Sequence, residues 1–301
     1  MSQETKPNIH IIGCGYLGKK LLNALISRNL TSPAMIHCLV RSTASQSQCA
    51  QSGVTSIAFD LDLVHSTLPS EINLSEAIIY YFAPPPSQGK TDDRAKQFLK
   101  LLTEYLHSTG EKITKIILIS TTGVYGNCKG QWVDENTPLN PSVDRALRRA
   151  DAEQQFQQFC DHTQTTLVIL RVSGIYGPGK LPLQRIKAQT PIVREEDSPF
   201  SNRIHSDDLL EICLKAGLSH DIEGIFNCAD GHPTTMCDYF MKLAKANHLP
   251  SPPTITLEQA QTQLSAGMLS YMAESRRINN KKLLTDFNLT LKYPDLDSGL
   301  K

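Results

Sequence analysis

Short apolar runs alternate with amphipathic stretches over the first 170 or so residues of the chain. The runs have strand length and predict β-strands at residues 9–12, 36–40, 55–59, 77–82, 115–120 and 166–171. Apolar residues at helical spacing predict helices at 17–28, 92–107 and 142–160, the last with Ser142 as its N-cap. Strands that alternate with helices are typical of a doubly wound parallel sheet, so an α/β fold is expected.

The pattern changes near residue 178, where loops rich in proline and charge begin. A short strand is predicted at 225–228, with helices near 206–218, 235–246 and 257–271. We therefore expect a main domain over residues 1–177 and a smaller C-terminal lobe over 178–301 that carries the substrate side and interleaves with the main domain. The serine- and glutamine-rich stretch 42–52 is interpreted as a surface turn and frayed helix.

Composition narrows the class of partner. Of the 301 residues, 30 are basic and 30 acidic, so no global field attracts nucleic acid or an anionic membrane. A small-molecule substrate is expected, with the chain a monomer or a homodimer. The polar amino terminus does not resemble a signal peptide and no stretch is long enough to span a bilayer, which favours a cytoplasmic protein.

The eight cysteines stand at 14, 38, 49, 128, 160, 213, 228 and 237, mostly inside apolar segments and without a C-x-x-C pair. In a chain of this length such scatter indicates reduced core thiols rather than disulfides or a zinc site. No metal site is predicted.

Three glycines follow the first predicted strand in the segment NIHIIGCGYLGKK. Gly13 permits a tight turn, Gly15 lets the backbone approach a pyrophosphate, and Gly18 lets the helix pack closely on the strand. The turn then directs its N–H groups and the helix dipole at the anion. This context predicts a dinucleotide site in a Rossmann-like domain.

The end of the second predicted strand indicates which dinucleotide is bound. An NAD site would carry an acid there for the ribose hydroxyls, but the segment reads IHCLVRSTAS. Arg41 and the neighbouring Ser42 suit the 2′-phosphate of NADP, because a guanidinium binds phosphate oxygens in a fork. NADP is therefore the expected cofactor, with NAD as the alternative and a solvated Arg41 as the structural interpretation.

With these motifs in place, the chain resembles the extended short-chain dehydrogenase/reductases of the NAD-dependent epimerase/dehydratase family, and its ending resembles an atypical, YeeZ-like subgroup. The likeness runs through FDLDL, YYFAPPP, STTGVYG, LRVSGIYGPG, NRIHSDDL and FNCADGHPTTMCDYF. It implies cofactor contacts from residues of the glycine turn and of the ends of the third and fourth strands, namely Tyr16, Leu17, Asp60, Leu61, Ala83 and Pro84.

The resemblance also implies an active site, with one departure. Thr121 matches the family's active-site Ser/Thr, whose hydroxyl holds a substrate oxygen. Where the family has Tyr and, four residues later, Lys, this chain has Arg145 and Arg149. Arginine stays protonated and cannot act as the general acid/base. Arg149 is expected to bind the nicotinamide ribose, while Arg145 either binds a carboxylate or phosphate or faces solvent.

Four further residues lie in the family motifs. Tyr125 and Tyr176 match tyrosines that are usually structural, so their recruitment as a replacement acid is the less favoured interpretation. His205 is expected to pack structurally, before an N-cap at Ser206. Arg203 is a candidate contact for an anionic substrate.

The sequence supports two functions of different classes, an enzyme and a binding protein. The first is an NADP(H)-dependent oxidoreductase or epimerase-like enzyme, acting on a small substrate such as a nucleotide sugar, whose proton comes from an unorthodox group or from water. The second is a catalytically inactive NADP(H)-binding sensor, which the missing tyrosine favours. A structural protein that has lost the cofactor is a third alternative, against which the glycines and Arg41 argue.

Overall fold

The computed structural model describes residues 6–301 and contains a seven-stranded sheet in the order β12-β7-β5-β4-β1-β2-β3. Its strands are β1 (Ile9–Ile12), β2 (Ile36–Val40), β3 (Thr55–Ala58), β4 (Ala77–Tyr81), β5 (Ile113–Thr121), β7 (Thr166–Val172) and β12 (Gly224–Cys228). β1 pairs in parallel with both β2 and β4, so the strand order reverses beside it. The predicted Rossmann-like, doubly wound α/β sheet is confirmed.

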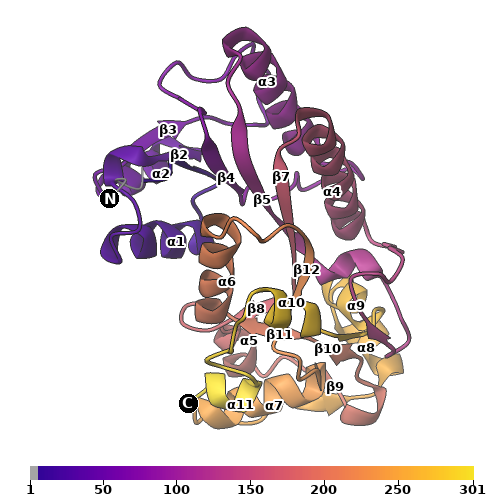
Figure 1. Cartoon of the computed structure of the whole chain (residues 1–301). Helices are drawn as coiled ribbons and strands as arrows, with labels where there is room; N and C mark the ends of the chain where they lie inside the picture. The colour runs from indigo at the N-terminus through magenta and orange to yellow at the C-terminus, as the bar shows by residue number, and fades with distance from the viewer. Residues whose placement is uncertain (1–5) are drawn as a thin grey trace. The chain divides into compact units, whose positions relative to one another are not determined.

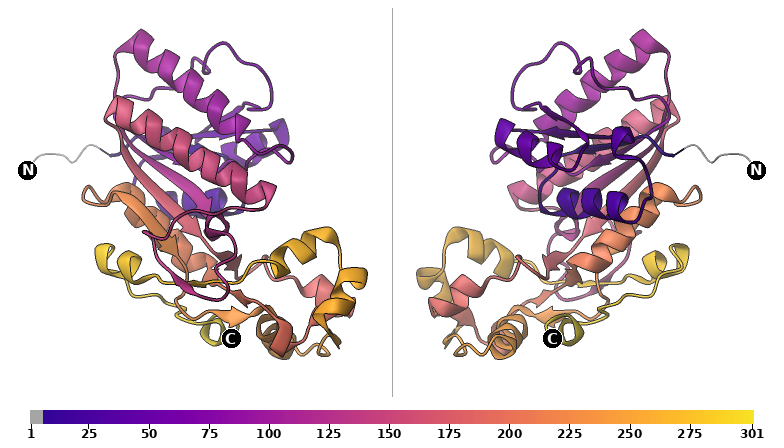
Figure 2. Two further views of the ribbon diagram at one scale, coloured as in Figure 1. Left: turned by 90° about the vertical axis from the view of Figure 1, so that its right-hand side faces the viewer. Right: turned by 90° about the vertical axis from the view of Figure 1, so that its left-hand side faces the viewer.

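Helices cover both faces of this sheet (Figure 1). They are α1 (Tyr16–Ser27), α2 (Thr43–Ala50), α3 (Asp93–Thr109), α4 (Asp144–Thr163) and α6 (Ser206–Leu218). On one face α3 and α4 run side by side (Figure 2). Phe98 of α3 and Phe156 of α4 both pack on Tyr81. On the other face Gly217 of α6 lies so close to Tyr80 that a Cβ there would overlap the tyrosine hydroxyl.

The remaining elements are short. They are the strands β6 (Trp132–Val133), β8 (Gly174–Tyr176), β9 (Ile192–Val193), β10 (Phe200–Ser201), β11 (Arg203–His205), β13 (Thr234–Thr235), β14 (Thr254–Ile255) and β15 (Arg277–Ile278), with the helices α5 (Leu183–Lys187), α7 (Met236–Ala246), α8 (Leu257–Gln263), α9 (Ala266–Met272), α10 (Lys281–Asp286) and α11 (Leu296–Gly299). Residues 6–301 also contain three 3₁₀ turns: η1 (Pro33–Met35), η2 (Thr122–Tyr125) and η3 (Glu195–Asp197).

The helix predicted at 206–218 is observed with those bounds, but two predicted N-caps and one continuous helix were wrong. α4 begins at Asp144, so Ser142 lies outside its cap position. α6 begins at Ser206 itself, and the ring of His205 accepts the Asp207 N–H at 3.2 Å in the role predicted for Ser206. The predicted 257–271 helix is split into α8 and α9 because the Ser265 side chain caps a new helix.

Contacts divide the chain into two compact units. The first comprises the chain up to Ser120 with Leu147–Leu170 and Leu210–Ile225, and holds most of the sheet. The second comprises Thr121–Ala146, Arg171–Leu209 and the chain from Phe226 onward. Its core gathers buried residues of β8, β9, α5, α7 and α11, among them Tyr176, Phe240 and Leu296.

Residues 292–299 are anchored within the second unit. The Asp208 carboxylate accepts the backbone N–H groups of Lys292 (2.7 Å) and Tyr293 (2.9 Å). The Tyr176 hydroxyl donates to the Asp295 carbonyl at 3.1 Å. Across residues 6–301, the helices are too short or too polar for any of them to cross a bilayer.

Candidate functional site

A cavity of about 280 Å³ opens where the carboxyl ends of β1, β2, β3 and β4 meet, and we call it the strand-end cavity. It is lined by Ile12, Gly13, Cys14, Gly15, Leu39, Val40, Arg41, Ser42, Ser45, Phe59, Asp60, Leu61, Phe82, Ala83, Pro84 and Arg94. The reversal of strand order beside β1 is the position at which ligands bind in open α/β sheets. Eight predicted cofactor residues therefore lie together: Gly13, Gly15, Arg41, Ser42, Asp60, Leu61, Ala83 and Pro84.

The three glycines of the turn have different local roles. Gly13 has φ +95°, and a Cβ there would lie 2.6 Å from the Ala83 nitrogen, so only glycine fits between the two strand ends. A Cβ on Gly15 would meet no atom within 4 Å, because this position faces open space at the start of α1. A Cβ on Gly18 would lie 2.9 Å from the Gly13 carbonyl oxygen, which explains the close packing of α1.

Arg41 and Ser42 stand at the end of β2. The Ser42 hydroxyl accepts the Ser45 N–H at 3.3 Å and so caps α2. Arg41 is exposed and, within residues 6–301, makes no hydrogen bond or ion pair, so its guanidinium remains available to an anion.

Arg94 is a cavity residue that sequence reasoning missed. Its guanidinium forms a two-pronged ion pair with Asp62 (2.6 and 2.5 Å) and donates to the Pro84 carbonyl at 2.9 Å. This pairing holds the pKa of the Asp62 carboxyl below its usual range. Asp62 lies 32 residues away in sequence, so only the fold reveals the contact.

Four predicted cofactor residues do not line the strand-end cavity. Tyr16, Leu17 and Gly18 lie in the first turn of α1. Arg149 reaches the rim of the cavity from α4, where it donates to the Ala83 carbonyl at 3.4 Å and lies 3.9 Å from the Asp92 carboxylate. Burial lowers the pKa of Arg149 and raises the pKa of Asp92, although each charge partly offsets the cost of the other.

A second cavity, of about 230 Å³, lies wholly within the second unit, and we call it the second-unit cavity. It is lined by Thr121, Thr122, Ser173, Gly174, Phe200, Ser201, Asn202, Arg203, Met236, Tyr271, Glu274 and Arg276. Two predicted residues, the catalytic candidate Thr121 and the substrate candidate Arg203, thus share one cavity. The hydroxyl of Thr121 accepts the Gly123 N–H at 3.2 Å.

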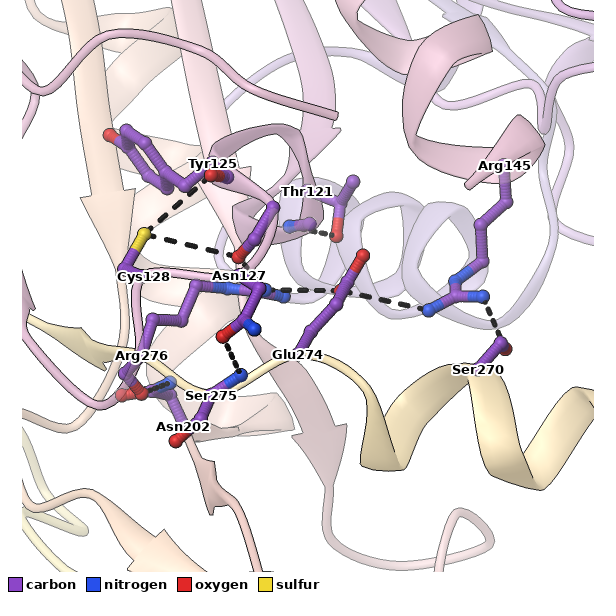
Figure 3. A network of polar contacts seen from close by, with 12 residues as sticks. Thr121, Tyr125, Asn127, Cys128, Arg145, Asn202, Ser270, Glu274, Ser275 and Arg276 are labelled. Carbon is purple, nitrogen blue, oxygen red and sulfur yellow. Dashed lines mark hydrogen bonds and ion pairs between the residues drawn. The ribbon is translucent and has the colours of Figure 1, made fainter. Parts of the chain in front are cut away.

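Arg145 contacts its own chain beside this cavity, an arrangement that neither sequence alternative described. Its guanidinium donates to the Ser270 hydroxyl at 2.7 Å and lies 3.8 Å from Glu274 (Figure 3). It also stacks over the Tyr271 ring, with 4.1 Å from Cζ to the ring centroid. Arg145 thereby connects α4 to the segment of α9 that lines the cavity.

The charged groups of the second-unit cavity are unequally paired. One carboxylate oxygen of Glu274 binds Arg276 at 3.0 Å, while the other is buried and has no hydrogen-bond partner within residues 6–301. Arg203 stacks over Tyr239 at 4.1 Å and donates to the Asn202 carbonyl at 3.0 Å. It makes no ion pair within residues 6–301, and burial lowers its pKa, an effect that the charge of Asp230 partly offsets. The cavity therefore offers an acceptor and a desolvated cation.

Three tyrosines of the second unit differ in what their hydroxyls contact. The Tyr125 hydroxyl donates to Asn227 at 2.8 Å and accepts from Arg171 at 2.9 Å, and that of Tyr176 binds the Asp295 carbonyl. Burial raises the pKa of both phenols, so neither is poised to exchange a proton. Tyr271 is 54% exposed and its hydroxyl makes no hydrogen bond within residues 6–301.

His205 packs between aromatic rings, with centroids 3.8 Å from Tyr293 and 5.1 Å from Tyr176. Sequence reasoning found this residue but missed Tyr271, Glu274 and Arg276. No site motif contains these three residues. They reach the cavity through contacts between segments far apart in sequence, such as the hydrogen bond from Arg276 to the Gly126 carbonyl.

A profile of the NAD dependent epimerase/dehydratase family matches residues 9–229, and the chain belongs to that family. Among individual proteins, the chain is similar to protein YeeZ of Escherichia coli (strain K12). The two are 23% identical over 293 residues, which span 95% of this chain and 96% of YeeZ. The expected family and YeeZ-like character are thus confirmed.

Solved structures share the fold. A functionally unknown conserved protein from Silicibacter pomeroyi DSS is 26% identical with a TM-score of 0.81, covering 97% of this chain and 96% of that one. Human epimerase family protein SDR39U1 (isoform 2), determined with NADPH, is 16% identical with a TM-score of 0.70, covering 97% of each chain.

Proposed function

We propose that the chain binds a nicotinamide dinucleotide, preferentially NADP(H), in the strand-end cavity and is an oxidoreductase or epimerase-like enzyme. Its substrate is a small anionic molecule, with nucleotide sugars as the class that the family favours. The observation that carries the proposal is the strand-end cavity itself, in which the glycine turn and an unpaired Arg41 face one space.

The preference for NADP(H) rests on charge. The cavity has no acid at the end of β2, where a ribose hydroxyl would need one, and Arg41 suits a phosphate instead. The similar human protein was determined with NADPH, whereas a structural neighbour from Bacillus anthracis, a dTDP-glucose 4,6-dehydratase, was determined with NAD.

Calorimetric titration with NADP, NADPH, NAD and NADH tests the cofactor assignment. Arg41→Asp should weaken NADPH binding by about 1–3 kcal/mol, the scale of a lost charge-assisted contact, and leave NADH less affected. Lys112→Asp is the matched control, because Lys112 is exposed just before β5, at the opposite end of the strands. Equal losses for both cofactors in Arg41→Asp would refute the 2′-phosphate role, and no binding to the wild type would refute the proposed function.

The second-unit cavity supplies the groups for proton exchange. A nicotinamide cofactor would, when bound, supply or accept the hydride. Thr121 polarises the substrate carbonyl, and the Tyr271 hydroxyl donates a proton to the carbonyl oxygen as it becomes a hydroxyl. The Arg145 guanidinium over the ring stabilises the resulting phenolate, which regains its proton from solvent. Arg145 and Tyr271 would together replace the family's Tyr and Lys.

Arg203 and Glu274 support an anionic, hydroxyl-bearing substrate. The desolvated Arg203 guanidinium, which makes no ion pair within residues 6–301, favours a phosphate or carboxylate. The Glu274 oxygen that has no hydrogen-bond partner in the same residues accepts a hydroxyl.

Turnover with NADPH or NADP and a panel of UDP- and dTDP-sugars, read by product chromatography and nicotinamide absorbance, tests this chemistry. Tyr271→Phe should lower kcat about 100-fold while the cofactor affinity is unchanged. Arg145→Met should also lower kcat, because Tyr271 loses the cation stacked over its ring. Unchanged kcat in Tyr271→Phe would refute the role of this residue.

A cofactor-binding sensor is the alternative function, and the arginines in place of Tyr and Lys favour it. It predicts tight NADPH binding, no turnover with any panel member, and no effect of Tyr271→Phe on binding. The same two assays therefore separate the functions.

A further inference from the structure

Three cysteines meet inside the first unit, next to the glycine turn. Cys14 stands between Gly13 and Gly15, Cys38 lies in β2, and Cys49 lies near the end of α2. Their sulfur atoms all lie within 4.8 Å of one another. The three residues are 4%, 0% and 2% exposed, so bulk water does not reach the cluster.

Strand register and a glycine in α1 allow the fold to bring these sulfurs together. Cys38 pairs with Ile11, so both point to the sheet face on which α1 packs. Gly18 of α1 leaves room there, and a Cβ on it would lie 3.5 Å from the Cys14 sulfur. All three thiols are free in the structure.

We propose that Cys14, Cys38 and Cys49 form a binding site for a single soft, thiophilic metal ion, of which Cu(I) is the representative. A metal–sulfur bond of about 2.3 Å places ligand sulfurs about 3.8–4 Å apart around one ion. The observed cluster needs only a small contraction to reach that spacing. It is too tight to surround a multinuclear iron–sulfur cluster.

The ligand set selects the kind of ion. Within residues 6–301 the group contains three sulfurs and no imidazole or carboxylate, which excludes hard cations such as Mg²⁺ and Ca²⁺. Structural zinc takes four ligands, and here the fourth would have to be a water in a buried position. A three-coordinate thiolate site suits Cu(I). Thiols that bind the ion release their protons to solvent.

Metal binding here requires neither cofactor nor turnover, although Cys14 also lines the strand-end cavity. The cluster differs from the expectation of inert core thiols in one physical respect. Three sulfurs this close to one another can bind one ion together, whereas thiols scattered through a core cannot.

Anaerobic titration of the full-length reduced protein with Cu(I), in competition with bathocuproine disulfonate, tests the proposal. The wild type should retain one Cu(I) per chain against the competitor, and X-ray absorption should give sulfur neighbours alone at about 2.3 Å. Cys38→Ala and Cys49→Ala should lower the retained copper at least tenfold. Cys160→Ala and Cys213→Ala are the matched controls, because these buried thiols lie outside the cluster and should leave binding unchanged.

Three outcomes would overturn the proposal: a folded wild type that retains no copper, retention unaffected by Cys38→Ala and Cys49→Ala, or nitrogen or oxygen neighbours in the absorption spectrum. If a variant fails to fold, the wild-type stoichiometry and spectrum still decide. NADPH binding measured on the same sample separates this result from the proposed function, because loss of copper with intact NADPH affinity refutes the metal site alone.

Discussion

The two cavities described above differ in whether backbone or side chains shape them. The strand-end cavity is shaped largely by backbone, where Gly13 meets Ala83 with no space for a side chain. The second-unit cavity is shaped by side chains, with Thr121, Arg203 and Glu274 arriving from distant segments. A backbone site depends on conformations that glycine alone adopts, so it leaves a short pattern in the sequence. A site built from side chains depends on tertiary contacts and leaves none.

The two units also bury titratable groups of opposite kind. In the first unit, burial, with a contribution from the neighbouring His37, lowers the pKa of His10 to about 3. In the second unit, burial raises the pKa of Asp230 to about 7. In both units burial favours the neutral form of the side chain. Keeping that form costs stability at low pH for His10 and at high pH for Asp230.

The largest effect should come from the backbone contact of the strand-end cavity. Gly13→Ala places a Cβ 2.6 Å from the Ala83 nitrogen at φ +95°, and it should destabilise the protein by on the order of 3 kcal/mol. Denaturant unfolding measures this loss.

Gly15→Ala is the internal control, since its Cβ meets no protein atom within 4 Å. It should leave the free energy of unfolding nearly unchanged and weaken only cofactor binding. Equal destabilisation by both substitutions would contradict the distinction between these glycines.

The next effect concerns acid stability of the first unit. His10 has a depressed folded pKa, so its contribution to stability is present above pH 6.5 and is lost as pH falls toward 3. Between pH 7 and pH 5 the loss should be about 2 kcal/mol. His10→Gln, which keeps a donor for the Asn73 carbonyl, should remove that slope in chemical unfolding experiments. An unchanged slope would mean that His10 is accessible to protons in the folded chain.

The smallest effect has the opposite sign and belongs to the second unit. Asp230 has a raised folded pKa, so its ionisation costs stability as pH rises from about 4 through 7. Asp230→Asn should stabilise the protein by at least about 1 kcal/mol at pH 8 and by less at pH 5. The amide oxygen can still accept the His232 N–H, which limits other changes.

The wild type alone cannot reveal these two slopes, because they offset each other between pH 5 and pH 7. Thermal unfolding of both variants at the two pH values separates them. The same pH dependence in both variants would remove the contrast between the units.

Prediction from sequence succeeded where structure is local. β1 and β2 were placed to the residue because their apolar runs are bounded by polar turns, and the glycine turn was recognised by spacing. The split between α8 and α9 was missed because a single Ser265 cap decides it. Arg94, Tyr271 and Glu274 were missed for a different reason. Their roles depend on partners that only the folded chain brings near, such as Asp62 for Arg94.

The anchoring of residues 292–299 matters for anyone who wishes to shorten the chain. Asp208 and Tyr176 each hold this segment, and Gly299 packs so closely on Tyr176 that a side chain there would overlap its ring. A truncation before residue 292 would leave the Asp208 carboxylate buried without its two N–H donors. Removing this segment should therefore destabilise the core of the second unit. In limited proteolysis we expect the segment to resist cleavage until the second unit unfolds.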